Sequence, residues 1–315
     1  MATHRGSGGP PPLSAAEFRA LYQRVRRQAP WGTADRGALD RITAAQRLAA
    51  VAEVRSGRSV TLAGVVRTRP APDNPEPCEY RMTGTVAGGI EPSGLQFATD
   101  WFAMSVHGDA DSHLDALCHV IYDGTLYNGV SADSLTPDGA RELSVDVARD
   151  GIVGRGVLLD IPRLRGVRWL EPGDHVSGDE LAAAEAAQRL RVGQGDLLFV
   201  RVGHRRRGSE LGPWNAAEAR AGLHPTAMEF LADRQVAVLG SDGNNDTAPS
   251  TTQGVAFPVH VLGIHAMGLH LLDYLSFEEL VPICEAADRW SFLCVIAPLR
   301  LPGATGSPVN PIAIL

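Results

Sequence analysis

Several features that define other protein classes are missing from this sequence. Its four cysteines, Cys78, Cys118, Cys284 and Cys294, form no CxxC pair, and its first residues lack the charged and then apolar pattern of a secretory signal. These absences predict a reduced, cytoplasmic protein. The longest apolar runs are interrupted by histidines before they reach the ~20 residues that a membrane-spanning helix needs, so a soluble chain is expected.

Positive charge is also scarce. The formal net charge is -7, and nucleic acids and anionic membranes both attract basic surfaces, so neither is expected as a partner. The one basic run, residues 205–207, is short and flanked by Gly203 and Gly208, which predicts a solvated loop rather than an anion site. No GxSxG elbow, Walker lysine or dinucleotide-binding fingerprint is present, so nucleophilic-serine, nucleotide and hydride chemistry have no support.

The pattern of strand and helix signals places the chain in the α/β class. Residues 1–13 are rich in glycine and proline and are expected to form a disordered tail, 14–56 an N-terminal helical extension, and 57–315 a single catalytic domain. Helices are predicted over 15–28 and 43–55, after a capping box of Ser177 and Glu180, and from Pro225. Strands are predicted in SVTLAG, GRGVLLDIP, GDLLFVRVG, QVAVLGSDG and FLCVIAPLRLP. Helices packed on a mixed sheet follow from this order.

One stretch, HGDADSHLDALCH at 107–119, concentrates the groups that carry chemistry. With 36 acidic residues and ten histidines in 315, a window of this length should hold about two such groups, and this one holds six. If the stretch is an extended strand, Asp109, Asp111, His113 and Asp115 share one face, where their charges repel unless a cation lies among them. An imidazole beside carboxylates suits zinc or manganese better than calcium. A polar turn with hydrogen-bonded carboxylates is the alternative.

A second contribution to such a site should come from elsewhere in the chain. The best candidate is PVHVLGIHAMGLHLLDYL, in which His260, His265 and His270 fall five residues apart. On a helix that spacing turns each side chain by about 140° from the last, so at most two of the three are expected to be functional.

The stretch SHLDALCH, followed by YDGTLYNG, resembles the signature HxGTHxDxPxH of the putative-cyclase superfamily, which includes kynurenine formamidases and isatin hydrolases. The segments WGTADRGALD, GRGVLLDIPR, GLHPTAMEFLADRQVAVLGSDGNND, VHVLGIHAMGLHLLD and APLRLPGATGSPVNPIAIL fit the longer relatives, described as dienelactone hydrolases or antibiotic-pathway cyclases. The resemblance covers about residues 30 to 315. It implies a swivelling β/β/α fold, a homodimer or homotetramer, and one or two divalent metals, Zn²⁺ or Mn²⁺.

The resemblance also implies roles for particular residues. His113 and Asp115 match the paired metal ligands, His119 matches the catalytic histidine, and His260 and Asp273 stand where formamidase-like members have a His and a Glu ligand. Where the motif begins with a ligand histidine, this chain has Asp109. Either Asp109 ligates the metal in its place or His107 swings in as a substitute.

Three functions fit these residues. In the first, a metal-activated water opens a lactone, cyclic amide or aryl formamide, with His119 as general base. In the second, the same metal acts as a Lewis acid in a cyclase or dehydratase of secondary metabolism. In the third, the chain is an inactive small-molecule-binding relative. Four further residues are candidates for substrate binding, on the positions of their segments near strand ends: Asp123, Tyr127, Asp242 and Asn245.

Overall fold

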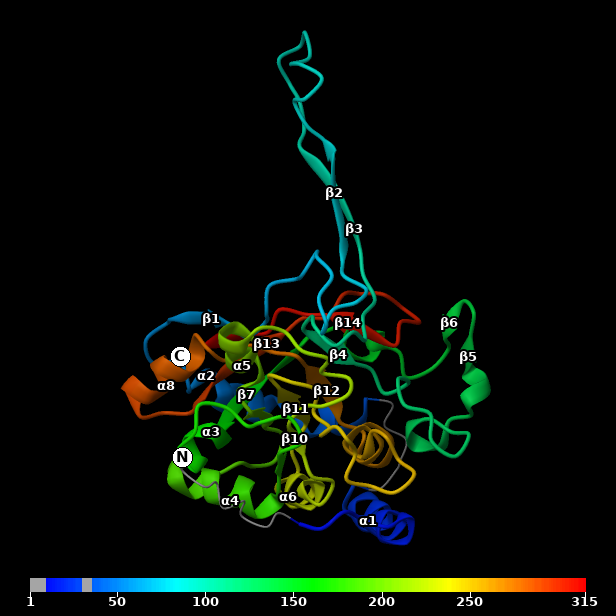
Figure 1. The fold of residues 1–315 in the computed structure, drawn as a ribbon, viewed down its shortest axis with the longest axis vertical. Helices are drawn as coiled ribbons and strands as arrows, with labels where there is room; N and C mark the ends of the chain where they lie inside the picture. The colour runs from blue at the N-terminus through cyan, green and yellow to red at the C-terminus, as the bar shows by residue number, and fades with distance from the viewer. Residues whose placement is uncertain (1–9, 30–35) are drawn as a thin grey trace.

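The computed structural model describes residues 10–29 and 36–315. Its centre is a mixed sheet of nine strands in the order β1-β15-β13-β7-β9-β11-β12-β4-β14 (Figure 1). The four strands from β7 to β12 in this order are parallel to one another, and antiparallel strands extend the sheet at both ends. This arrangement confirms the predicted α/β class with a mixed sheet.

The strands of the sheet are β1 (Ser59–Thr61), β4 (His113–Asp115), β7 (Ile152–Asp160), β9 (Leu197–Arg201), β11 (Val238–Ser241), β12 (His270–Asp273), β13 (Ser291–Ile296), β14 (Gly306–Pro308) and β15 (Ile312–Ile314). The other strands form two-stranded ribbons: β2 (Glu79–Gly84) with β3 (Thr99–Ala103), β5 (Leu135–Thr136) with β6 (Gly139–Ala140), and β8 (His175–Val176) with β10 (Gly222–Leu223). The α-helices are α1 (Ala15–Gln28), α2 (Ala44–Val51), α3 (Ile161–Arg165), α4 (Gly178–Ala187), α5 (His204–Leu211), α6 (Ala227–Arg234), α7 (Pro258–His260) and α8 (Leu280–Ala287). A π-helical segment, η5 (Val261–Ala266), continues α7, and short 3-10 turns lie at Gly37–Arg41, Tyr127–Gly129, Ala132–Ser134 and Val145–Ala148.

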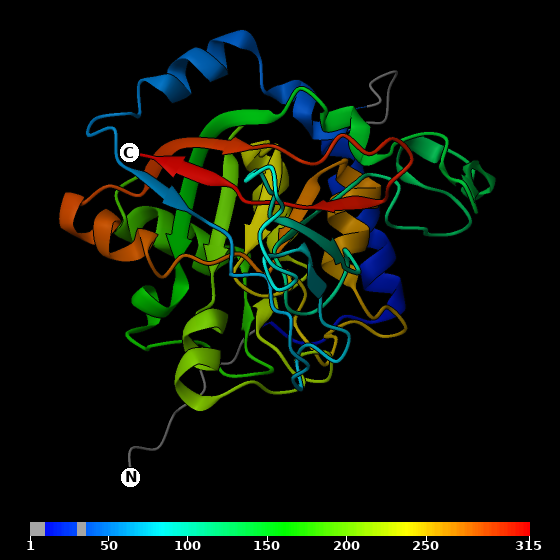
Figure 2. The same ribbon diagram turned by 90° about the horizontal axis from the view of Figure 1, so that it is seen from above.

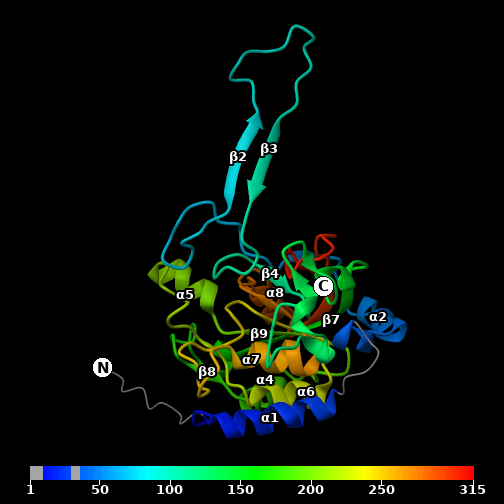
Figure 3. The same ribbon diagram turned by 90° about the vertical axis from the view of Figure 1, so that its right-hand side faces the viewer.

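The apolar patterns of the sequence explain the central layers. Strand β9 is buried along its whole length, and β7 is buried over its second half, as expected for parallel strands covered on both faces. Helix α2 packs against β7 and β13, and α4 packs against β7 and α6. Figure 3 shows α1, α4 and α6 together in one layer, on the side of the molecule away from the β2–β3 hairpin.

The predicted helices are found, with shifted ends. Helix α1 spans the predicted 15–28, and α4 begins at the predicted capping box of Ser177 and Glu180. Helix α2 is shorter than the predicted 43–55, because the chain leaves the helical conformation after Val51. Its Leu48 and Val51 are exposed rather than packed in the core. Helix α6 begins after Thr226, so Pro225 lies just before it instead of in its first turn.

The N-terminal tail expected over 1–13 falls mostly outside the described residues. Its last residue, Leu13, donates a backbone hydrogen bond to the carbonyl of Thr251 and accepts one from Gln253. No helix among the described residues has both the length and the apolar character needed to cross a membrane.

Two local predictions were wrong. Only His113–Asp115 of the histidine-rich stretch is a strand, so its acidic side chains do not line one face. The segment before β4 bends, because Asp111 accepts the backbone N–H of Arg67 and the Asp109 carboxylate turns toward the hydroxyl of Tyr274.

The basic run 205–207 is not a loop but part of α5. The Arg205 guanidinium donates hydrogen bonds to the backbone carbonyls of Ala110, Tyr274 and Leu275. It therefore joins α5 to the segment before β4 and to the segment after β12.

We predict that Arg205→Lys lowers the free energy of unfolding by about 1–3 kcal/mol, because an ammonium group cannot span three carbonyls as a guanidinium does. Chemical denaturation measures the change. The neighbouring Arg206→Lys is the matched control: Arg206 pairs with Glu210 at a more exposed position, and its replacement should change stability by less than ~0.5 kcal/mol. Equal stability of the two variants would contradict the bridging role.

Candidate metal centre

Strand β4 lies between β12 and β14 and brings the predicted residues of the motif to one place. Its pairing with β12 sets His113 opposite Asp273, and its pairing with β14 sets Asp115 opposite Gly306. Asp273 is the last residue of β12, next to the segment that follows the parallel strand β11. Ends of neighbouring parallel strands commonly gather functional groups in α/β proteins.

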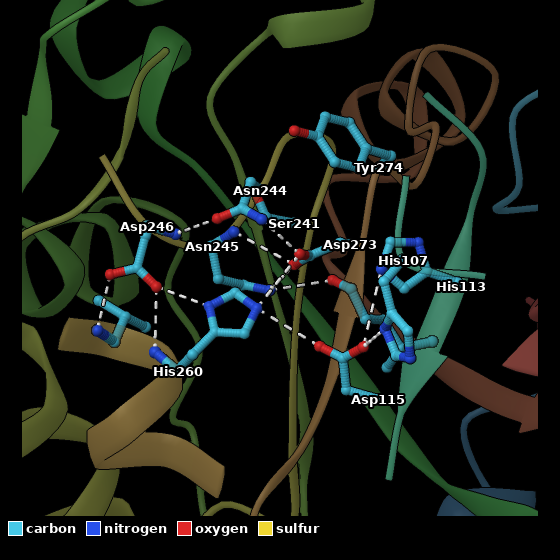
Figure 4. A network of polar contacts seen from close by, with 12 residues as sticks. His107, His113, Asp115, Ser241, Asn244, Asn245, Asp246, His260, Asp273 and Tyr274 are labelled. Atoms are coloured by element: carbon cyan, nitrogen blue, oxygen red, sulfur yellow. Dashed lines mark hydrogen bonds and ion pairs between the residues drawn. The ribbon is translucent and has the colours of Figure 1, made fainter. Parts of the chain in front are cut away.

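One group of possible ligands consists of His107, His113 and Asp115, whose donor atoms all lie within 4.8 Å of one another (Figure 4). His107 Nδ1 is 2.9 Å from Asp115 Oδ1, and its Nε2 is 2.9 Å from the hydroxyl of Thr305. His113 Nδ1 is 2.8 Å from the carbonyl oxygen of Asp111. A carbonyl only accepts, so Nδ1 carries the proton and Nε2 faces Asp115 with a lone pair, 3.7 Å from Oδ1.

A second group consists of Asp115, His260 and Asp273, and it meets the same distance limit. His260 Nδ1 lies 2.6 Å from Asp246 Oδ2 and must donate to that carboxylate. Its Nε2 is then directed between two other carboxylates, 3.3 Å from Asp115 Oδ2 and 3.4 Å from Asp273 Oδ2. Asp115 belongs to both groups, with one oxygen turned toward each.

The loop after β11 holds the second group in place. Asp246 accepts the backbone N–H groups of Val259 and His260 as well as the His260 ring. Asn244 and Asn245 donate side-chain hydrogen bonds to Asp273, at 2.7 and 2.5 Å. Such contacts to carboxylates and amides orient ligand side chains at metal sites.

The charges of the centre are strongly coupled. Burial alone would raise the pKa of Asp115, but the surrounding imidazoles, His119 first among them, hold that pKa well below its usual value. Burial alone would lower the pKa of His260, but Asp273 and Asp115 hold that pKa well above its usual value. A bound cation would take over the role that the His260 proton plays between the two carboxylates.

The residues fit a divalent metal. Asp115 Oδ2 is buried without a hydrogen-bond donor among the described residues, although His260 Nε2 is 3.3 Å away. Each group offers imidazole nitrogen and carboxylate oxygen, the donor set that suits zinc or manganese. The expected ligands His113, Asp115, His260 and Asp273 could thus hold one or two cations together with His107.

His119, the expected catalytic residue, borders this centre. Its ring stacks on that of His107, with the centroids 3.8 Å apart and the planes 9° from parallel, and it lies 6.3 Å from the ring of His260. Burial lowers the pKa of His119 to about 4, so its imidazole is neutral at pH 7 and able to accept a proton.

Asp109, expected as a ligand in place of the motif histidine, lies in neither group. It accepts a 2.6 Å hydrogen bond from the hydroxyl of Tyr274, a buried side chain. Of the two residues that the sequence left as alternatives, Asp109 and His107, it is His107 that lies in a group of possible ligands.

The expected substrate-binding residues are spread over different surroundings. Asn245 touches Asp273 within the centre, whereas Asp242 is buried and accepts the backbone N–H groups of Val202 and Gly203. Burial raises the pKa of Asp242 to about 6. Asp123 lies on an exposed turn, and Tyr127 is buried against Gly268.

The other two histidines of the C-terminal segment lie outside both groups. His265 contacts the hydroxyls of Tyr22 and Thr125. His270 is fully buried on β12, and neither of its ring nitrogens has a hydrogen-bond partner among the described residues. Of the three histidines, only His260 lies in a group of possible ligands among the described residues.

Sequence reasoning missed Asp246, Asn244, Thr305 and Tyr274. The first two belong to the same GSDGNND segment as Asp242 and Asn245, so the position of an acid after a strand was a usable signal for Asp246. Thr305 and Tyr274 had no such signal, because their contacts depend on how β14 and β12 pair with β4.

Comparisons with known proteins identify the family of this chain. The profile of the family described as Putative cyclase matches residues 44–245, more than half of the chain. The chain therefore belongs to this family, and it is an enzyme. A search of curated proteins found no match.

Solved structures share the fold. A crystal structure described as a novel cyclase is 28% identical, with a TM-score of 0.83. The match covers 93% of this chain and 99% of the chain in that structure. An isatin hydrolase bound to the product analogue thioisatinate is 20% identical, with a TM-score of 0.57 and coverage of 87% and 99%. A predicted metal-dependent hydrolase from Bacillus stearothermophilus is 18% identical, with a TM-score of 0.52 and coverage of 81% and 97%.

We predict that His107→Ala lowers the affinity for the cation of the first group by more than ~100-fold, because a direct ligand is lost. Loss of a residue that only hydrogen-bonds to a ligand typically lowers metal affinity by ~10–100-fold. Asp109→Asn keeps an acceptor for Tyr274 and should leave metal binding unchanged. Elemental analysis of both variants after dialysis against metal-free buffer measures the difference. Loss of metal from the Asp109 variant alone would assign the ligand to Asp109 instead.

Proposed function

We propose that this chain is a metal-dependent hydrolase that opens a lactone, a cyclic amide or an aryl formamide. The observation that carries the proposal is the shared carboxylate of Asp115, with two other possible ligands on each side of it. The fold shared with an isatin hydrolase and a metal-dependent hydrolase supports the same reaction class.

The ligands would be His107 and His113 on one side of Asp115, and His260 and Asp273 on the other. A divalent cation bound there supplies Lewis acidity toward a carbonyl oxygen and lowers the pKa of water. Zn²⁺ and Mn²⁺ both suit these donors.

His119 is the proton carrier in this proposal. Its neutral imidazole borders the centre, so it can take a proton from the attacking water and pass it to the leaving nitrogen or oxygen. The stacked ring of His107 fixes the plane of His119, and the Asp115–His107–Thr305 contacts in turn fix His107. In this proposal the base borders the ligands without being one of them.

The matching cyclase structure favours a second candidate, ring closure or dehydration without consumption of water. The same residues would act, with the cation as Lewis acid and His119 moving a proton from carbon. The two reactions differ in whether an oxygen atom from water enters the product.

We predict that His119→Asn retains its metal but loses turnover by about 10²–10⁴-fold, the usual contribution of general acid–base catalysis. Initial rates on a panel of aryl formamides, lactones and cyclic amides, together with metal content, test this. His175→Asn is the control, since His175 lies on β8 and contacts His224 rather than the centre. Full activity in the His119 variant would reject its assignment as the base.

Reaction in ¹⁸O-labelled water separates hydrolysis from cyclisation. We expect mass spectrometry to find one solvent oxygen in the carboxylate product, because hydrolysis must add water across the carbonyl–heteroatom bond. A turnover product without label would assign the cyclase reaction instead.

A further inference from the structure

A buried arginine near the metal centre has no acidic partner. Arg220 is only 2% exposed, and its guanidinium forms no ion pair with a carboxylate among the described residues. Arginine is almost never buried to this extent unless its charge is paired. The positive charge of Arg220 is therefore left without direct compensation by an acidic side chain.

Part of the Arg220 guanidinium supports the backbone. Its Nε donates to the carbonyl of Asp246 at 3.0 Å, and its Nη1 donates to the carbonyls of Ala216 and Ala217 at 2.9 and 3.4 Å. A guanidinium has five N–H donors, and these bonds use three of them. The two hydrogens on Nη2 reach no acceptor in the part of the chain that the structure describes. A structural role therefore explains Nε and Nη1 but leaves Nη2 available to a ligand.

Phe257 connects this guanidinium to the metal centre. The Arg220 Cζ atom lies 5.3 Å from the centre of the Phe257 ring, and the centre of the His260 ring lies 5.7 Å from the same point. Asp246 joins the two residues as well, because its carbonyl accepts from Arg220 and its carboxylate accepts from His260. Phe257 is 46% exposed, so a molecule from solvent that rests on its ring lies next to both Arg220 and a possible metal ligand.

Further arginines make these surroundings positive. Figure 2 shows α5 beyond the arrowheads of β7 and β9, at the carboxyl ends of the parallel strands, and this helix carries Arg205 and Arg207. Burial lowers the pKa of His204, the first residue of α5, to about 3, and the charges of Arg205, Arg220, Arg67 and Arg207 lower it as well. Four guanidinium groups thus lie around one side chain.

Direct ion pairs neutralise only half of these four charges. Arg67 pairs with Asp73, and Arg207 pairs with Glu171. Arg205 and Arg220 donate to backbone carbonyls instead, and neither has an ion-pair partner among the described residues. This region therefore attracts an anion, although the chain as a whole has a net charge of -7.

A carboxylate suits the free part of the Arg220 guanidinium. The N–H groups of arginine form short, charge-assisted hydrogen bonds with carboxylate oxygens. A phosphate group has three strong acceptor oxygens, and the two hydrogens of Nη2 would leave most of that capacity unpaired. The ring of Phe257 favours a planar, apolar body next to the charged group. A small planar molecule with one carboxylate matches both features.

We propose that Arg220 binds a carboxylate of the substrate, at a position separate from the carbonyl group that reacts at the metal centre. Phe257 contacts the planar body of the substrate between these two points, and Asp246 fixes the distance between Arg220 and His260. The reacting group is the one named in the proposed function, on which this inference rests. The substrate is then an aryl formamide, a lactone or a cyclic amide that carries a carboxylate.

Paired substrates test this inference. Each aryl formamide, lactone and cyclic amide is compared as a carboxylate and as the corresponding uncharged carboxamide. We expect the unmodified chain to prefer the carboxylate by about 10–100-fold in kcat/KM, the effect of a charge-assisted hydrogen bond. Arg220→Gln should lose most of this preference. The control is Arg206→Gln, which removes a positive charge from a more exposed position of α5 and should leave the preference unchanged.

An unmodified chain that turns over both members of each pair equally would overturn the role of Arg220 while leaving the hydrolase proposal intact. An Arg220→Gln variant with the full preference would do the same. Hydrolysis of no substrate would instead reject the proposed function, and the carboxylate site would then be judged by binding alone.

Calorimetry of the full, metal-free chain with benzoate and benzamide measures that binding without turnover. Without a metal, benzoate cannot bind as a metal ligand. We expect benzoate to bind about 10–100-fold more tightly than benzamide, and Arg220→Gln, shown to be folded by circular dichroism, to lose the difference. Equal binding of the two compounds to the unmodified chain would overturn the inference even if Arg220→Gln does not fold.

Discussion

The structure depends on one buried carboxylate. Asp115 is fully buried at the end of β4, which lies between β12 and β14, and the imidazoles of His107, His113 and His260 all turn toward it. An ionised carboxylate in such surroundings is costly unless positive charge or hydrogen-bond donors compensate it. The imidazoles supply part of that compensation, and a divalent cation on each side would supply the rest. The Asp115 carboxylate therefore affects both the stability of the fold and the chemistry of the centre.

The surrounding strands and helices fix the positions of the possible ligands on both sides of the Asp115 carboxylate. β12 supplies Asp273 and β14 supplies the backbone opposite Asp115, while α7 supplies His260 through its bonds to Asp246. His107 arrives by a different route, because it follows the end of β3 after only three intervening residues.

The sequence predicted much of this centre but not all of it. His113, Asp115 and His119 could be placed because they share one short motif, and His260 and Asp273 because the resemblance extends to their segment. The choice between His107 and Asp109 could not be made, since it depends on how the chain bends between β3 and β4. That bend rests on Arg67, Arg205 and Tyr274, which are distant in sequence from the motif. The same holds for the fold: α1 and α4 carry capping boxes that can be seen in the sequence, whereas nothing in the sequence of the β2–β3 hairpin shows how far it projects.

Metal titration of the full, metal-free chain tests the central claim most directly. If Asp115 serves both groups, calorimetry with Zn²⁺ or Mn²⁺ should count two ions per chain, and Asp115→Asn should lose both sites while circular dichroism shows a folded protein. An unmodified chain that binds no ion at stoichiometric amounts, or an Asp115 variant that still binds two, would contradict the account.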